Sequence, residues 1–186
     1  MCVMSALSVL LLIIILILLY GVFLYNRFVR MQNICDEGWS GISVQLKRRY
    51  DLIPNLVECV KGYAKHEQSA LEQIVEKRTL AMNAGTPARK AQAENELTHS
   101  LKSLFAISES YPDLKANENF IQLQNSLNVV EDDLQNARRY YNATVRNLNT
   151  AVASFPSNLI ARQFGFAKRE FFEIDDAEKE NVKVSF

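Results

Sequence analysis

The hydrophobic pattern of the chain begins with a long apolar run, from Ala6 to Leu24, that contains no charged side chain. At about 1.5 Å per residue, a helix of this length covers about 28 Å, close to the ~30 Å hydrocarbon core of a bilayer. A cleaved signal peptide fits less well, because the apolar core is too long and Tyr25-Asn26-Arg27 offers no small-residue cleavage site. The run therefore predicts a single-pass transmembrane helix.

Beyond this span, inward positions recur at alternating steps of four and three residues, the spacing of one helical face. We therefore expect the membrane helix to continue into the first helix of a bundle. The segment Tyr50 to Pro54 interrupts the pattern, because Asp51 is suited to cap a new helix and Pro54 to occupy its first turn. The uninterrupted series is Phe28, Gln32, Cys35, Trp39, Ile42, Leu46 and Arg49.

Two more helices follow from the same spacing. The second carries inward residues from Leu56 to Ala81 and is expected to end at Asn83-Ala84-Gly85. Thr86 and Pro87 provide an N-cap and a first-turn proline for the third helix. Its predicted inward residues are Glu94, Leu97, Leu101, Leu104 and Ser108.

The fourth helix has the most regular pattern, with inward residues from Phe120 to Phe155. Pro112 is expected to end the third helix and Asn117 to cap the fourth, which Pro156 then stops. A repeat close to 3.5 residues indicates left-handed, coiled-coil-like packing. A short terminal helix is predicted from Ser157, as its cap, to Phe166, and the last residues, Val182 to Phe186, alternate as an extended segment would.

Together these elements predict an all-α fold in which an N-terminal transmembrane helix continues into an elongated antiparallel four-helix bundle. We expect an anchor over residues 1–26, a bundle over residues 27–168 and a partly extended tail over residues 169–186. The part that follows the anchor is long enough to bury the core of one domain.

Charge changes the picture in two ways. The chain has 21 basic and 21 acidic residues, so it has no global field that would attract nucleic acid, and no nucleic-acid partner is expected. Arg27 and Arg30 follow the span closely and no Lys or Arg precedes it, which favours a cytoplasmic bundle. The opposite orientation stays open, because long domains are translocated despite their charges.

Metal and redox chemistry have little support. Cys2, Cys35 and Cys59 lack the spacing of a zinc or redox motif. We expect Cys35 and Cys59 to be small core side chains, with a disulfide between them as the alternative. One Glu-x-x-His unit, Glu96 to His99, is present, but a di-iron bundle needs two.

Nothing in the sequence resembles a nucleophile-base pair or a phosphate-binding glycine loop, so we expect no enzyme activity, no cofactor and no metal. The rival interpretation is a metal-binding helical-bundle enzyme that uses Glu67, Glu94, Glu96 and His99.

Several polar residues occupy inward positions, namely Gln32, Arg49, Glu67, Arg78 and Glu94. Buried polar groups need partners, so these residues either pair within the bundle or require another chain to complete it. In a continuous helix the basic cluster Lys47-Arg48-Arg49 lies roughly 36 Å beyond Leu24, too far to be held by lipid across a Debye length of ~8 Å. We expect internal ion pairs there, for example with Asp51, Glu109 or Asp113.

The stretch from Val44 to Glu58, VQLKRRYDLIPNLVE, resembles the signature of the LemA family. The resemblance continues through Val60 to Glu67, at Tyr111 to Asn117 and at Phe155 to Asn158. It implies a long antiparallel four-helix bundle on one membrane helix in bacteria, and no catalytic residues. Family members tied to magnetosome membrane formation make membrane organisation the functional expectation.

We therefore predict a membrane-anchored helical scaffold in the bacterial inner membrane that organises other membrane proteins or its own homo-oligomers. A membrane-remodelling coat formed by self-assembly is an alternative. An up-down fold brings two candidate partner-binding turns together at the membrane-distal end, although stopping two helices requires the same residue types. The candidates are Lys47, Arg48, Arg49, Tyr50, Asp51, Pro54, Asn55, Tyr111, Pro112, Asp113, Lys115 and Asn117.

Overall fold

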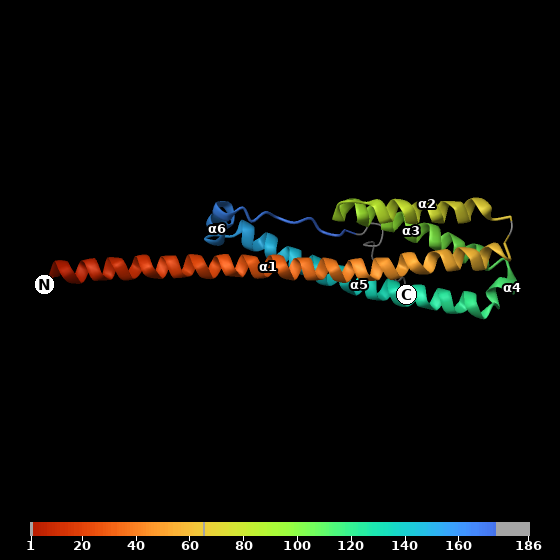
Figure 1. Ribbon diagram of the computed structural model, residues 1–186, viewed down its shortest axis with the longest axis horizontal. Coiled ribbons are helices and arrows are strands. Elements are labelled where there is room, and N and C mark those ends of the chain that lie inside the picture. Colours follow the sequence, from red (N-terminus) through yellow and green to blue (C-terminus); the bar gives the residue numbers. More distant parts are fainter. Residues whose placement is uncertain (1, 65, 174–186) are drawn as a thin grey trace, which may run out of the picture. The chain divides into compact units, whose positions relative to one another are not determined.

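A computed structural model describes residues 2–64 and 66–173 of the chain. This part of the protein is all-α, as predicted, and forms no strand. The predicted extended segment from Val182 to Phe186 lies outside the described residues. The helices are α1 (Cys2–Lys61), α2 (Gln68–Asn83), α3 (Pro87–Ser108), α4 (Pro112–Lys115), α5 (Glu118–Ala153) and α6 (Ser157–Phe164) (Figure 1).

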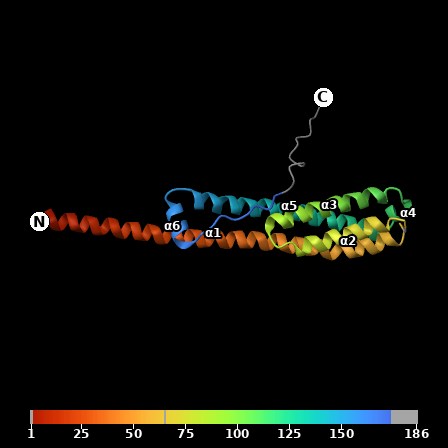
Figure 2. The same cartoon turned by 90° about the horizontal axis from the view of Figure 1, so that it is seen from above.

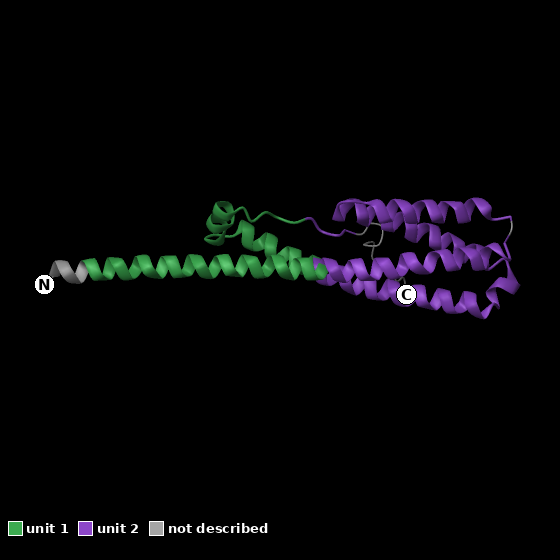
Figure 3. Ribbon diagram, in the orientation of Figure 1, with its two compact units in different colours: residues 1–38, 142–169 green, residues 39–141, 170–186 purple. Residues whose placement is uncertain are grey.

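The chain folds as two compact units (Figure 3). Unit 1 combines residues 1–38 with residues 142–169, and unit 2 combines residues 39–141 with the chain from residue 170 onward. Helices α1 and α5 each contribute one part to each unit. The predicted continuation of the apolar helix into the bundle is confirmed, because α1 runs from Cys2 to Lys61 without a break.

The N-terminal part of α1 is apolar and long enough to cross a membrane. Only 6% of its most apolar window is buried, and the large side chains from Leu7 to Phe23 are exposed. A core helix of a water-soluble protein would bury these side chains against other elements. The exposure therefore supports the predicted membrane anchor.

Unit 2 contains the four-helix arrangement, built from the C-terminal part of α1, α2, α3 and the N-terminal part of α5 (Figures 1 and 3). Consecutive helices run in opposite directions, as short connections require. All five inward positions predicted for α3 are buried, from Glu94 to Ser108. The predicted caps are also present, since Thr86 Oγ1 accepts from the Arg89 amide and Asn117 Oδ1 accepts from the Phe120 amide.

The predicted helix break at Tyr50 to Pro54 is wrong. Helix α1 continues through Pro54 to Lys61, and the chain turns only between Gly62 and Glu67, before α2. A proline inside a helix has no N–H for the carbonyl four residues earlier, which here is that of Tyr50. The Arg78 Nε donates to this carbonyl at 2.8 Å and so replaces the missing donor.

This replacement predicts energetic coupling between Pro54 and Arg78. Arg78→Met removes the donor and is expected to lower the free energy of unfolding by about 1–2 kcal/mol. In a Pro54→Ala background the backbone amide gained at position 54 can bond to the Tyr50 carbonyl, so the same change should cost less. Denaturant unfolding of the detergent-solubilised full chain, in all four combinations, measures the coupling.

Thr79→Ala on α2 is the matched control, because the Thr79 hydroxyl donates to the Val75 carbonyl within its own helix. It should cost the same with Pro54 as in the Pro54→Ala background. An equal cost of Arg78→Met in both backgrounds would show that the guanidinium does not compensate for the proline.

Unit 1 joins the N-terminal part of α1 to the end of α5 and to α6. The terminal helix was predicted, and it ends at Gly165, whose φ of 75° is the left-handed conformation that favours glycine at a helix C-terminus. Ser157 is not its side-chain cap, because the hydroxyl donates to the carbonyls of Ala151 and Ser154 instead. The predicted inward position of Phe155 is wrong, since this side chain is 80% exposed.

Both cysteines beyond Cys2 are free thiols, which excludes the alternative of a disulfide between them in this structure. Cys35 is buried in unit 1 and Cys59 is half-buried in unit 2. The prediction that they serve as small core side chains is confirmed most fully for Cys35.

Candidate functional site

A buried polar cluster connects three helices of unit 2. Arg49 of α1 donates from Nη1 to Glu94 Oε2 of α3 at 3.0 Å, and these side chains are only 3% and 0% exposed. The hydroxyl of Tyr50, also on α1, donates to the other oxygen of the same carboxylate. Both Glu94 oxygens are therefore bonded, which a charged group deep in a bundle requires.

The cluster continues to α5. Arg49 Nη2 donates to Thr98 Oγ1 at 2.7 Å and lies 3.3 Å from Glu131 Oε2, and the other Glu131 oxygen lies 3.9 Å from Arg138. Burial and the neighbouring Glu94 carboxylate raise the pKa of the Tyr50 phenol above its ordinary value, so Tyr50 keeps its proton and remains a donor.

The predicted internal pairing of the basic cluster is confirmed for Arg48 and Arg49, but the suggested partners are wrong. Arg49 pairs with Glu94 and Glu131, and Arg48 lies 3.4 Å from Asp133. Because α1 continues past Pro54, Asp51 is on the same straight helix as the arginines, and the carboxylates opposite them come from the middles of α3 and α5. Arg49 and Tyr50 are therefore core residues.

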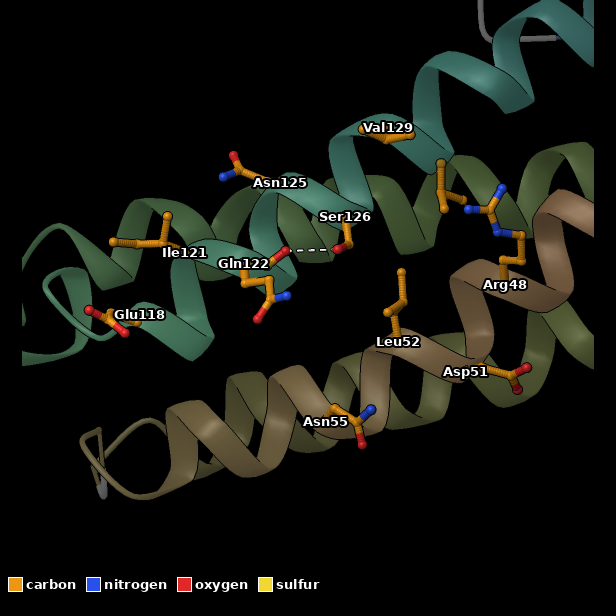
Figure 4. Close-up of a pocket in the computed structure, with 11 residues that line it drawn as sticks. Arg48, Asp51, Leu52, Asn55, Glu118, Ile121, Gln122, Asn125, Ser126 and Val129 are labelled. Carbon is orange, nitrogen blue, oxygen red and sulfur yellow. Dashed lines mark hydrogen bonds between the residues drawn. The ribbon is translucent and has the colours of Figure 1, made fainter.

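A surface groove lies between α1 and α5 in unit 2, with a volume of about 790 Å³ (Figure 4). Leu52 of α1 and Gln122 of α5 point into the space between the two helices. Three of the predicted partner-binding residues, Arg48, Asp51 and Asn55, line its α1 side. We call this surface the α1–α5 groove; its α5 side is formed by Glu118, Ile121, Gln122, Asn125, Ser126, Val129 and Val130.

The two sides of the groove have matching helical spacing. Arg48, Asp51, Leu52 and Asn55 stand at steps of three, four and seven residues, so they share one face of α1. The same spacing relates Gln122, Asn125, Ser126 and Val129 on α5. Ile121 and Val129 are exposed apolar side chains among charged and amide groups. Such a mixed trough between two helices has the form that receives a further amphipathic helix.

A second groove of about 690 Å³ shares Leu52, Asn55, Gln122 and Ser126 with the first and extends toward the end of α1. Asn117 and Tyr63 line it, and the Asn117 amide donates to the Tyr63 hydroxyl at 2.9 Å. Asn55 and Asn117, from the two predicted turns, are therefore brought to one surface.

The other candidates are dispersed. Lys47 and Pro54 are exposed on α1 outside both grooves. Tyr111 donates to Glu67 at 3.2 Å, and Lys115 pairs with Glu109. Pro112 and Asp113 are exposed in α4, where Leu114 is the buried residue. These contacts explain the motif from Tyr111 to Asn117 mainly as a turn that joins α3 to α5.

Sequence reasoning missed the α5 side of the groove. The groove residues from Ile121 to Val129 lie between the regular inward positions of this helix. The sequence pattern predicted only those inward positions, such as Phe120, Leu127 and Val130. The usable signal was the presence of two large apolar residues, Ile121 and Val129, outside that series.

The rival metal site receives no geometric support. Among the described residues, no group of three or more His, Cys, Asp or Glu side chains is placed to hold a metal ion. Glu94 is bonded to Arg49 and Tyr50, Glu96 pairs with Lys77, and His99 is exposed. Four of the inward polar residues have partners within the bundle, as the first of the two predicted options requires. Arg49 and Glu94 pair with each other, Glu67 accepts from Tyr111, and Arg78 donates to the Tyr50 carbonyl.

Comparison with known proteins gives a consistent result. The family model described as "LemA family" matches residues 38–186. Protein LemA of Metamycoplasma hominis is 25% identical over 179 residues, which cover 91% of this chain and 80% of that protein. Magnetosome protein MamQ 2 of Paramagnetospirillum magneticum is 26% identical over 175 residues. MamQ of Magnetospirillum gryphiswaldense is 26% identical over 174 residues.

The two MamQ matches cover 80% of this chain and 64% of the relative, so the chain spans less than two thirds of their length.

Proposed function

This chain belongs to the LemA family, and we propose that it is a membrane-anchored helical scaffold whose α1–α5 groove binds a helix of another membrane protein. The observation that carries the proposal is the pair of matched faces on α1 and α5, which line the two sides of one groove. Exposed Ile121 and Val129 offer apolar contacts, and Arg48 and Asp51 offer charges that fix a partner's direction.

A scaffold role agrees with the distribution of charged groups. The buried ion pairs of Arg49 with Glu94 and Glu131 join the helices of unit 2 to one another. The accessible charged groups, such as Arg48 and Asp51, lie along the α1–α5 groove. The relatives named magnetosome proteins favour work at a membrane. We propose the bacterial inner membrane as its location, with the bundle in the cytoplasm because Arg27 and Arg30 follow the span.

Site-specific crosslinking in cells tests the groove. A photo-crosslinking amino acid replaces Asn125 on α5, inside the groove, and a matched one replaces Gln73 on the exposed face of α2. We expect a discrete adduct from position 125 that position 73 does not give, because a bound helix would lie against the groove only.

Filling the groove provides the specificity control. Ser126→Trp should abolish the adduct from position 125, whereas Ser103→Trp on the exposed surface of α3 should leave it unchanged. An adduct containing a second, differently tagged copy of this chain would replace the proposed partner with self-association. Equal crosslinking from positions 125 and 73 would overturn the proposed binding site.

A further inference from the structure

Helix α6 and the preceding Phe155 lie beside the end of the membrane span, and we propose that they insert into the interfacial region of the same bilayer. The ligand is the lipid surface itself, and the proposal uses only residues of unit 1. It is independent of the α1–α5 groove, which belongs to unit 2, so either proposal can fail alone.

The first argument is the level of α6 along α1. A Cβ atom added to Gly21 would lie 3.9 Å from Cδ1 of Ile160, so the two helices approach closely there. The ring of Tyr25 packs edge-on against Phe164, with centroids 5.0 Å apart. The apolar run ends at Leu24 and the first charge is that of Arg27. This is the level at which a spanning helix leaves the hydrocarbon core.

The second argument is the direction of α6. It lies crosswise, from the end of α5 to the side of α1 (Figure 2). A helix crosswise to a membrane-spanning helix lies close to the plane of the membrane, as interfacial helices do. Its position is fixed at the far end, where Phe166 stacks on Phe28 with centroids 4.8 Å apart and Arg169 pairs with Asp36.

The third argument is the set of apolar side chains that this end of unit 1 exposes. Phe155 is 80% exposed, Leu159 56% and Phe164 57%. Single exposed apolar residues are ordinary on protein surfaces. Two of these three are tied to the span, since Phe155 lines one hollow with the exposed Tyr20 and Phe164 packs on Tyr25; Leu159 lies between them in sequence, in α6. The lipid that surrounds the span of α1 would therefore also contact these side chains.

The fourth argument is charge. Although the whole chain is neutral, residues 1–38 and 142–169 contain six basic and two acidic side chains, and one of the acids, Asp36, is paired with Arg169. Lys and Arg near an anionic bilayer are attracted by about 1 kcal/mol each. Apolar side chains with a basic surround are the composition that binds an anionic membrane surface. The basic residues are Arg27, Arg30, Arg146, Arg162, Lys168 and Arg169.

Depth-dependent quenching of tryptophan fluorescence tests the proposal on the full chain. The protein is reconstituted into vesicles of phosphatidylcholine and phosphatidylglycerol that carry doxyl groups either near the headgroups or near the bilayer centre. The variants Phe155→Trp and Leu159→Trp should add a blue-shifted emission that shallow doxyl groups quench more than deep ones. Trp39, the one native tryptophan, is present in every sample and supplies the background.

Val75→Trp is the matched control, because Val75 is an exposed apolar residue on α2 of unit 2. Its added emission should remain red-shifted and unquenched. Red-shifted, unquenched emission from positions 155 and 159 in correctly helical protein would overturn the proposal. So would blue-shifted emission that lipid quenchers do not reach, because it would assign this surface to a protein contact.

Discussion

Glu94→Ala is expected to lower the free energy of unfolding of unit 2 by about 3–5 kcal/mol, the usual cost of leaving one partner of a buried ion pair alone. Arg49 would then be a cation, 3% exposed, that retains only Thr98 and the partly exposed Glu131 as partners. The Tyr50 hydroxyl would lose its acceptor at the same time. Denaturant unfolding of the detergent-solubilised chain, followed by Trp39 fluorescence and far-ultraviolet circular dichroism, measures the loss.

Two controls separate burial from charge. Asp133→Ala breaks the exposed contact with Arg48 and should cost no more than about 1 kcal/mol. The double change Arg49→Met with Glu94→Leu removes both charges and should recover much of the stability, because apolar residues of similar volume often replace a buried pair without loss. A cost of Glu94→Ala as small as that of Asp133→Ala would show that the cluster is hydrated and contributes little.

The helices themselves could be predicted because their signals are local. The inward spacing of α3, the Thr86 and Asn117 caps and the glycine that ends α6 depend on residues within a few positions of one another. Pro54 misled prediction for a physical reason. Whether a proline ends a helix depends on whether the carbonyl four residues before it finds another donor. Here that carbonyl belongs to Tyr50, and its donor, Arg78, lies on a different helix.

The candidate site was only partly predictable. The sequence identified Arg48, Asp51 and Asn55, because they belong to a dense polar motif. The same motif kept Arg49 and Tyr50 among the candidates although both are buried, and the helical spacing indicated this only for Arg49. One residue of difference, about 100° around a helix, decides between the core and the groove. The partners Glu94 and Glu131 come from α3 and α5, and no local pattern indicates which of several acidic residues lies opposite Arg49.

Phe172→Ala should have the second large effect, also about 3–5 kcal/mol, because it removes a fully buried aromatic side chain. Phe172 is 1% exposed in unit 2, its ring centroid lies 5.9 Å from that of Trp39, and the Arg138 guanidinium carbon lies 5.0 Å from it. The backbone beside it is also held, since the Tyr141 hydroxyl donates to the Glu170 carbonyl at 3.0 Å. Phe172 therefore anchors the described residues 170–173 in the core of unit 2.

Phe171→Ala is the matched control for this prediction, because the neighbouring ring is only half-buried and should cost clearly less. Tyr141→Phe keeps the ring and removes the hydroxyl that donates to the Glu170 carbonyl, and it should cost about 0.5–1.5 kcal/mol. Denaturant unfolding ranks the three variants, and Trp39 emission reports the contact directly, since its ring packs on both Phe172 and Tyr141. If Phe172→Ala changed Trp39 emission and stability no more than Phe171→Ala does, residues 170–173 would be held by their backbone contacts and not by the Phe172 ring.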